Sequence, residues 1–390
     1  MVIRNSKRRR EVWFGGGAAA IVLTLGVAGC LRQASASADA PLWPGSRFSE
    51  GDRSRAMMRA LAFVEHSASD TANFKAQASD YVYCFYSIAT TARDARLRAE
   101  ARRAGVVYAK KWAAMRGSLS PNASKEEVAD MVFGWLPASL LGQRDDAIKA
   151  QLRKAAARFN AVEYLGFDPA AEAPPADIPA VCRYDGLQNL RGTKVCRKCA
   201  RPLDMRSKYE IWEDALITTY SGDRYGIRLG GAYRDVIKWI PAMRPYPARS
   251  ETTEATFGDI LYALTHLVYT LNDYGHYRLP RDVLPDELTY LKENVGQAIA
   301  QHDPETMGEL LDSLKSLGLT LSDPVIRSGM EYLLETQRSD GTWGAASEKD
   351  PYTLYHSAWT AIDGLKDCEW EGERLSFPEL RDMLKNMQKR

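Results

Sequence analysis

The sequence predicts an all-α protein with one small, cysteine-bearing loop inserted between two helical regions. Apolar residues recur at helical spacing from residue 51 to about 165 and again from 207 onward, and strand-like alternation is scarce. Proline and glycine punctuate the joints between these segments. A Pro/Ala-rich stretch after residue 165 leads into residues 182–204, which hold three of the six cysteines.

The composition limits which classes of protein this chain can belong to. The chain has 390 residues, of which 45% are hydrophobic and 26% charged, as in an ordinary globular protein with a sizeable core. The formal net charge is only +2, so the chain lacks the strongly basic surface of a nucleic-acid-binding protein. We therefore expect no nucleic-acid partner.

Residues 1–29 are predicted to be a signal peptide. A basic segment precedes a short apolar run, which is too brief for a comfortable membrane span. The run ends in Val27-Ala28-Gly29 before Cys30, and this pattern resembles the bacterial lipobox. The resemblance implies cleavage before Cys30 and lipid on its sulfur and on the new amino terminus. The alternative is a plain signal anchor in which Cys30 has no role.

Residues 30–50 are small, polar and proline-containing, and they predict a lipidated tether between the membrane and the folded body. Several acyl chains at Cys30 would anchor the protein stably. We therefore expect a cell-envelope protein in contact with membrane lipid, held to the inner or outer membrane and facing the periplasm or the cell exterior.

The remaining chain divides into an N-terminal helical region (51–170), a cysteine knuckle (176–206) and a C-terminal helical domain (207–390). Ser124 and Glu127 predict a capping box at the start of one N-terminal helix. The helices expected after the knuckle are about 208–221, 230–241, 252–274, 286–301, 304–317, 323–338, 352–366 and 377–388.

The knuckle carries a candidate structural metal site. Cys196 and Cys199 form one Cys-x-x-Cys arm, and Cys182 with Asp185 forms a second arm at the same spacing. Two such arms can close a tetrahedral zinc site, in which a carboxylate is an acceptable ligand. The segment resembles a zinc-ribbon knuckle and departs from it at Asp185. The alternative is a disulfide among the three cysteines, because an exported protein meets an oxidising compartment.

Two further cysteines are left over by this assignment. Cys84 lies in the N-terminal helical region and Cys368 near the C-terminus. Counting cysteines in an exported chain predicts a disulfide between them, which would join the two helical regions.

Two neighbouring segments carry a family resemblance. Residues 327–344 place Gln337, Gly341 and Trp343 after an amphipathic helix, which resembles the repeat of squalene and oxidosqualene cyclases. Residues 350–365 resemble a segment of protein prenyltransferase beta subunits, in which a zinc ligand occupies the place of His356. Both families share the α/α toroid, so the resemblance over roughly residues 205–368 implies helical hairpins around a central cavity.

The chain lacks residues that both families need for their known activities, so we expect neither activity here. The chain has no Asp-x-Asp-Asp run, which the cyclases use to protonate their substrate. It has no cysteine between Cys199 and Cys368, where a prenyltransferase takes another zinc ligand. The resemblance therefore implies a ring of helices with His356 facing inward, and no reaction.

A polar pair occurs twice in two apolar helices. His266 and Asp273 are seven residues apart, as are His356 and Asp363. Seven residues are two helical turns, so the members of each pair are predicted to share a helix face. In a toroid both faces would point into one cavity, and the four residues would hold a second, catalytic metal. The alternative is a pair of core histidines, with both aspartates at polar helix ends.

These features predict an exported, membrane-anchored lipoprotein with a metal-dependent hydrolase or oxidoreductase activity. Its cavity would take a hydrophobic or aromatic small molecule. The alternative is a non-catalytic envelope scaffold or binding protein, in which the His/Asp pairs are structural hydrogen bonds. Analogy of fold alone adds a terpenoid- or polysaccharide-processing enzyme.

Overall fold

The computed structural model describes residues 43 and 48–388. Over these residues the chain is all-helical, with isolated β-bridges and no strand, so the predicted all-α class is confirmed. The predicted signal peptide (1–29), Cys30 and nearly all of the tether (30–50) lie outside the described residues.

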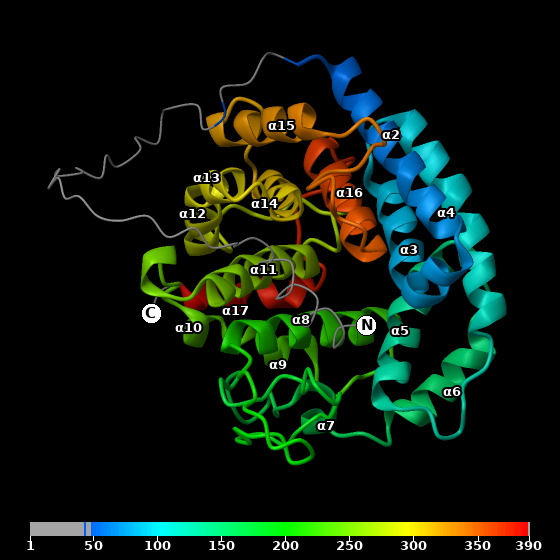
Figure 1. Cartoon of the computed structure of the whole chain (residues 1–390), viewed down its shortest axis with the longest axis vertical. Helices are drawn as coiled ribbons and strands as arrows, with labels where there is room; N and C mark the ends of the chain where they lie inside the picture. The colour runs from blue at the N-terminus through cyan, green and yellow to red at the C-terminus, as the bar shows by residue number, and fades with distance from the viewer. Residues whose placement is uncertain (1–42, 44–47, 389–390) are drawn as a thin grey trace, which may run out of the picture.

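Six helices, named the inner helices, contact one another in a closed series. Going along the chain, each inner helix packs against the next, and the last one, α16, packs against the first, α3 (Figure 1). Their bounds are α3 (Thr71–Thr91), α5 (Lys125–Leu140), α8 (Lys208–Tyr225), α11 (Glu254–Leu271), α14 (Pro304–Ser316) and α16 (Pro351–Leu365).

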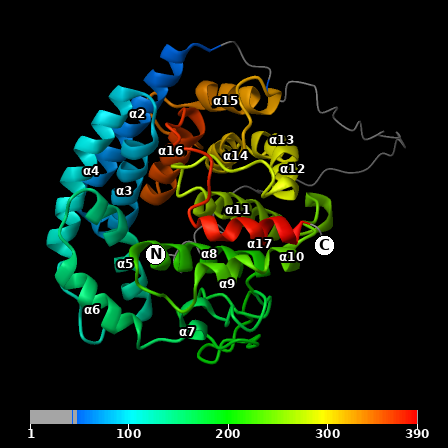
Figure 2. The same ribbon diagram turned by 180° about the vertical axis from the view of Figure 1, so that it is seen from behind.

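The other helices are named the outer helices, and several of them pack against two neighbouring inner helices. For example, α2 packs against α16 and α3, α4 against α3 and α5, and α15 against α14 and α16. Figure 2 shows α17 on the side opposite to that viewed in Figure 1. The outer elements are α2 (Glu50–Ser69), α4 (Ala95–Met115), α6 (Asp146–Ala156), α7 (Ala161–Leu165), α9 (Tyr233–Ile237), α10 (Ile240–Met243), α12 (Pro285–Glu293), α13 (Val295–Ala300), α15 (Pro324–Thr336) and α17 (Arg381–Met387), with 3₁₀ turns at Arg249–Glu251 and Pro378–Leu380.

Local sequence signals account for most helix ends. The Ser124 hydroxyl accepts a hydrogen bond of 3.2 Å from the backbone N–H of Glu127 at the start of α5, which is one of the two hydrogen bonds of the predicted capping box. The helix expected over 252–274 begins two residues later and ends early, at Leu271. It ends there because Asp273 and Tyr274 adopt left-handed backbone angles, with φ of 57° and 51°.

One hydrophobic core runs through both helical regions, from α2 to α17. The Gln337 side chain, at the end of α15, donates a hydrogen bond of 2.9 Å to the carbonyl of Ala56 in α2. The Trp343 indole donates one of 2.7 Å to the carbonyl of Leu333. The motif behind the family resemblance thus ties the C-terminal helices to the first described helix.

The helices α14 and α16 cross closely at two glycines. A Cβ atom on Gly308 would lie 2.3 Å from the backbone oxygen of Thr360, and one on Gly364 would lie 2.9 Å from Cα of Gly308. Only glycine therefore permits this approach. The crossing brings the Glu305 carboxylate of α14 within 3.2 Å of the His356 imidazole of α16.

Candidate functional site

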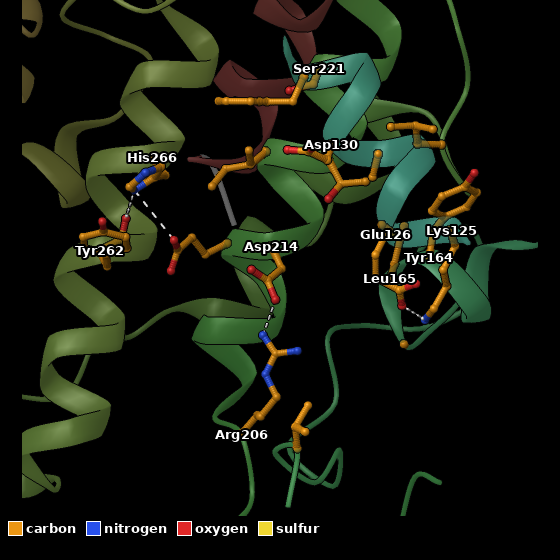
Figure 3. A pocket seen from close by; sticks show the side chains of 18 of the residues that line it. Lys125, Glu126, Asp130, Tyr164, Leu165, Arg206, Asp214, Ser221, Tyr262 and His266 are labelled. Carbon is orange, nitrogen blue, oxygen red and sulfur yellow. Dashed lines mark hydrogen bonds and ion pairs between the residues drawn. The ribbon is translucent and has the colours of Figure 1, made fainter. Parts of the chain in front are cut away.

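A cavity of about 200 Å³ lies among the inner helices. Side chains from α3, α5, α8, α11 and α16 line it, together with the loop that holds the cysteine knuckle. Five carboxylates and six aromatic rings are among the lining residues, and Figure 3 shows several of the lining side chains. His266 and His356 are both among the residues that line this cavity.

His266 is held by its own helix. Its Nδ1 lies 2.9 Å from the backbone oxygen of Tyr262 and 3.9 Å from a carboxylate oxygen of Glu213 on α8 (Figure 3). Since a carbonyl oxygen only accepts, Nδ1 carries the proton in this hydrogen bond. Nε2 is therefore the basic nitrogen of His266.

His356 belongs to a group of three candidate metal ligands. Its Nδ1 lies 3.2 Å from Oε1 of Glu305, and Glu309 lies one turn further along α14. One ligand atom from each of these residues lies within 4.8 Å of the other two, so the group could hold a metal ion. Sequence reasoning missed both glutamates. The only sequence feature that could have identified them is the spacing of two carboxylates four residues apart on one helix.

Side chains of α11 orient these carboxylates. The hydroxyl of Thr265 donates a hydrogen bond of 2.8 Å to Glu309, and the hydroxyl of Tyr262 donates one of 3.4 Å to Glu305. The Tyr352 ring stacks on the imidazole of His356 with ring centroids 5.0 Å apart. Such partners fix the orientation of metal-ligating side chains.

Asp273 does not accompany His266. The left-handed turn after Leu271 directs its carboxylate to the hydroxyl of Tyr220 and to the guanidinium of Arg224, at 2.6 Å. The helix ends before the second turn that the predicted shared face requires. Asp273 is thus a buried ion-pair partner at a helix end and lies outside the cavity lining.

Asp363 does not accompany His356 either. Although it lies two turns along the same helix, its carboxylate pairs with the ammonium group of Lys366. Burial raises the pKa of Asp363, and Lys366 opposes that effect. The group that the geometry assembles around His356 therefore contains Glu305 and Glu309 in place of Asp363.

Two further acids in the cavity were not singled out from the sequence. Asp80, on α3, is 1% exposed, and burial raises its pKa to about 7. Its Oδ2 accepts a hydrogen bond of 3.0 Å from the hydroxyl of Tyr355. Burial also raises the pKa of Asp214 to about 6, against the opposing effect of the paired Arg206. A carboxyl group that keeps its proton near neutral pH can donate it.

The four predicted knuckle residues converge. Ligand atoms of Cys182, Asp185, Cys196 and Cys199 all lie within 4.8 Å of one another, so the group could hold a metal ion. The three cysteines are free thiols, which excludes the alternative disulfide in this structure. Their geometry confirms the predicted juxtaposition of two arms.

The two arms also share one backbone pattern. In the first arm the N–H of Gly186 donates to the carbonyl of Cys182 at 2.8 Å, and in the second the N–H of Ala200 donates to that of Cys196 at 2.9 Å. Both Gly186 and Ala200 have positive φ angles, of 73° and 57°. The backbone N–H of Leu187 is the main cause that lowers the pKa of Asp185 to about 2, so Asp185 is ionised and suited to bind a cation.

Cys84 and Cys368 do not form the predicted disulfide. Both are buried free thiols. The backbone of Cys368 forms a bridge with that of Ala92, eight residues beyond Cys84 on the same helix axis. Eight helical residues span about 12 Å, whereas bridged cysteines keep their Cα atoms within about 7 Å.

Comparison with family models, with curated proteins and with solved structures gives no match for this chain. Among the described residues, no helix combines the length and the apolar character needed to cross a membrane.

Proposed function

We propose that this protein is an exported lipoprotein enzyme, folded as an α/α toroid, that hydrolyses a small organic ligand with the help of a metal ion. Glu305, Glu309 and His356 would hold the metal. The observation that carries the proposal is their convergence, from two neighbouring inner helices, beside a cavity lined with acids and aromatic rings.

The closed series of inner helix contacts supports the toroid. Each step from one inner helix to the next passes through one or more outer helices, as helical hairpins in a ring require. The hydrogen bond from Gln337 to Ala56 supports closure between the last hairpin and the first. A ring of this kind encloses a site on all sides and excludes water from it.

The ligand set suits a hydrolytic centre. Two carboxylates and one imidazole are oxygen and nitrogen donors of the kind that bind zinc or manganese. When bound, such a metal lowers the pKa of a water ligand and polarises the bond to be cleaved. On the protein side, the basic Nε2 of His266 accepts a proton, and the buried carboxyl of Asp80 donates one.

The knuckle has a structural role in this proposal. Cys182, Asp185, Cys196 and Cys199 would bind zinc in a closed tetrahedral site. The same loop contributes Ile178, Pro179, Val181 and Gln188 to the cavity wall, so the zinc would hold that wall in place. The lipobox-like segment before Cys30 supports export and anchoring.

Elemental analysis of the protein lacking residues 1–30 tests the proposal. We expect one metal ion at each cluster, with the cavity metal lost in His356→Ala and the knuckle metal lost in Cys196→Ser. His266→Ala is the matched control, since it removes a histidine from the same cavity wall and leaves both clusters intact.

Full retention of metal in His356→Ala would contradict the cavity centre. Absence of any cavity metal, together with a lower melting temperature in His356→Ala, would favour the alternative of a non-catalytic envelope protein. In that case the cluster around His356 is a structural hydrogen-bond network.

A further inference from the structure

Buried polar atoms without a hydrogen-bond partner gather in the cavity. Among the described residues these atoms include Oδ1 of Asp80, the hydroxyl of Tyr164, Oγ of Ser221 and Nε1 of Trp359, and all four residues line the cavity. Buried polar groups are nearly always hydrogen-bonded, and each one left unsatisfied costs roughly 1–3 kcal/mol. Because these four residues surround one cavity, a single ligand bound there could supply the missing partners.

These atoms come from separate elements around the cavity. Asp80 is on α3, Ser221 on α8, Trp359 on α16 and Tyr164 on α7. The side chains of Asp80, Ser221 and Trp359 are only 1%, 2% and 9% exposed. They combine acceptors with donors, since the indole of Trp359 donates, the hydroxyl of Ser221 does both, and the carboxyl of Asp80 accepts when ionised and donates when protonated. The complementary ligand therefore carries several polar groups around its rim, each able to donate or accept.

The same cavity offers flat apolar surfaces. The rings of Phe133, Tyr262, Tyr274 and Tyr352 join the indole of Trp359 in its wall. A pyranose ring has C–H groups on its faces and hydroxyls on its rim, so it matches aromatic faces and dispersed polar atoms together. A purely apolar ligand would leave the four polar atoms unsatisfied.

The charge of the lining sets the charge of the ligand. Glu126, Asp130 and Glu213 line the cavity, beside Asp80 and Asp214, whose pKa values are raised by burial. The cations beside them are already engaged. The Lys125 ammonium lies 3.5 Å from Glu126 and donates to the carbonyl of Glu163, and Arg206 pairs with Glu210 and Asp214. Such a lining repels phosphates and uronates and accepts neutral or amino sugars.

We propose that the cavity binds one unit of a saccharide that carries no negative charge, either a neutral sugar or an amino sugar. This inference deepens the proposed function, because it names the ligand class of the same cavity. The volume of about 200 Å³ is below the ~300–1,000 Å³ of sites for drug-sized ligands. One sugar ring is therefore enclosed, and any further units of the chain lie outside.

Titration calorimetry on the protein lacking residues 1–30 tests this proposal. The probes are maltotriose and cellotriose as neutral saccharides, chitosan trisaccharide as the amino saccharide, trigalacturonate as the anionic saccharide and geraniol as the apolar ligand. We expect saturable binding of a neutral or amino saccharide at concentrations up to about 10 mM, which covers weak specific affinities.

Four variants separate the cavity from the rest of the core. Ser221→Ala and Trp359→Phe each remove one unpartnered polar atom from the cavity and should raise Kd about tenfold. Ser313→Ala and Trp112→Phe are matched controls. Each also removes a buried atom without a hydrogen-bond partner, but neither residue lines the cavity, so both should bind as the parent protein does.

Three results would overturn the proposal: binding of geraniol or trigalacturonate alone, no binding of any probe, or equal weakening in the cavity variants and the controls. Metal analysis of the same preparation keeps this test separate from that of the proposed function. If the protein holds the cavity metal but binds no saccharide, only the proposed ligand class is refuted. A saccharide-binding protein without cavity metal refutes the metal centre alone.

Discussion

Replacing Gly308 by alanine perturbs the crossing on which the cavity cluster depends. The added Cβ would lie 2.3 Å from the Thr360 oxygen and 2.4 Å from its carbonyl carbon, whereas ordinary contacts lie at 3.4–4 Å. Both obstructing atoms belong to the backbone, so no side-chain rotation relieves the clash. The helices α14 and α16 must therefore separate by about 1 Å.

The energetic cost follows from that separation. A gap of 0.5–1 Å already forfeits a quarter to a half of each dispersion contact, and overpacked core positions typically lose ~1–3 kcal/mol. Because α14 and α16 form one of the largest helix contacts, we expect a loss near the upper end, about 3 kcal/mol. Urea unfolding of the protein lacking residues 1–30 measures this loss.

Gly258→Ala is the matched control. Gly258 is also inside a helix, α11, and its added Cβ meets nothing within 4 Å. Alanine there should stabilise the protein by roughly 0.5–1 kcal/mol, because glycine is the poorer helix former. A free energy of unfolding in Gly308→Ala within about 1 kcal/mol of the parent value would refute the reasoning about the α14–α16 crossing.

The remaining predictions concern pH, metal removal and ring closure. Burial raises the pKa of Asp80 from 3.8 to about 7, so its stabilising contribution is complete below pH 3.8 and is lost as the pH rises through 7. Between pH 4 and 8 the parent protein should therefore lose about 4 kcal/mol more stability than Asp80→Asn; equal pH profiles in urea unfolding would contradict this. Asp367→Asn is the control that keeps the loss, because burial raises the pKa of Asp367 but the hydrogen bond and charge of Arg53, with the charges of Lys315 and Arg93, together lower it. A chelator should lower the melting temperature of the parent protein more than that of Cys196→Ser, because it removes the knuckle metal and the cavity metal from the parent and only the cavity metal from the variant, which already lacks a knuckle ligand; an equal drop in both would argue against a knuckle metal. Gln337→Ala should cost about 1 kcal/mol in calorimetric stability by removing the hydrogen bond to Ala56, and an unchanged stability would show that this bond does not matter for ring closure.

The knuckle was predictable residue by residue because its geometry is local. Both arms have the same spacing, and all four candidate ligands fall between residues 182 and 199. Short-range backbone hydrogen bonds shape each arm without help from the rest of the fold. Asp185, which departs from the usual cysteine, nevertheless takes the ligand position in the structure.

The cavity cluster was only half predictable. The sequence identified His266 and His356, because a histidine on an apolar helix stands out. It predicted Asp273 and Asp363 as their partners. That prediction assumes that each helix extends as far as its aspartate, and that the histidine and aspartate on one helix face meet the same neighbouring groups. The turn at Asp273 breaks the first condition, and the ammonium of Lys366 breaks the second.

The sequence by itself determined the helical class, most helix ends and the knuckle, since periodicity, capping and short loops act over a few residues. Only the tertiary structure decided which acids meet the histidines. Glu305 reaches His356 because two glycines let α14 and α16 approach closely, and Asp80 reaches the cavity because α3 packs against α16 from nearly 300 residues away. Contacts between distant segments depend on how the helices pack against one another. Helical periodicity indicates which face of a helix is buried, but not which other helix that face contacts.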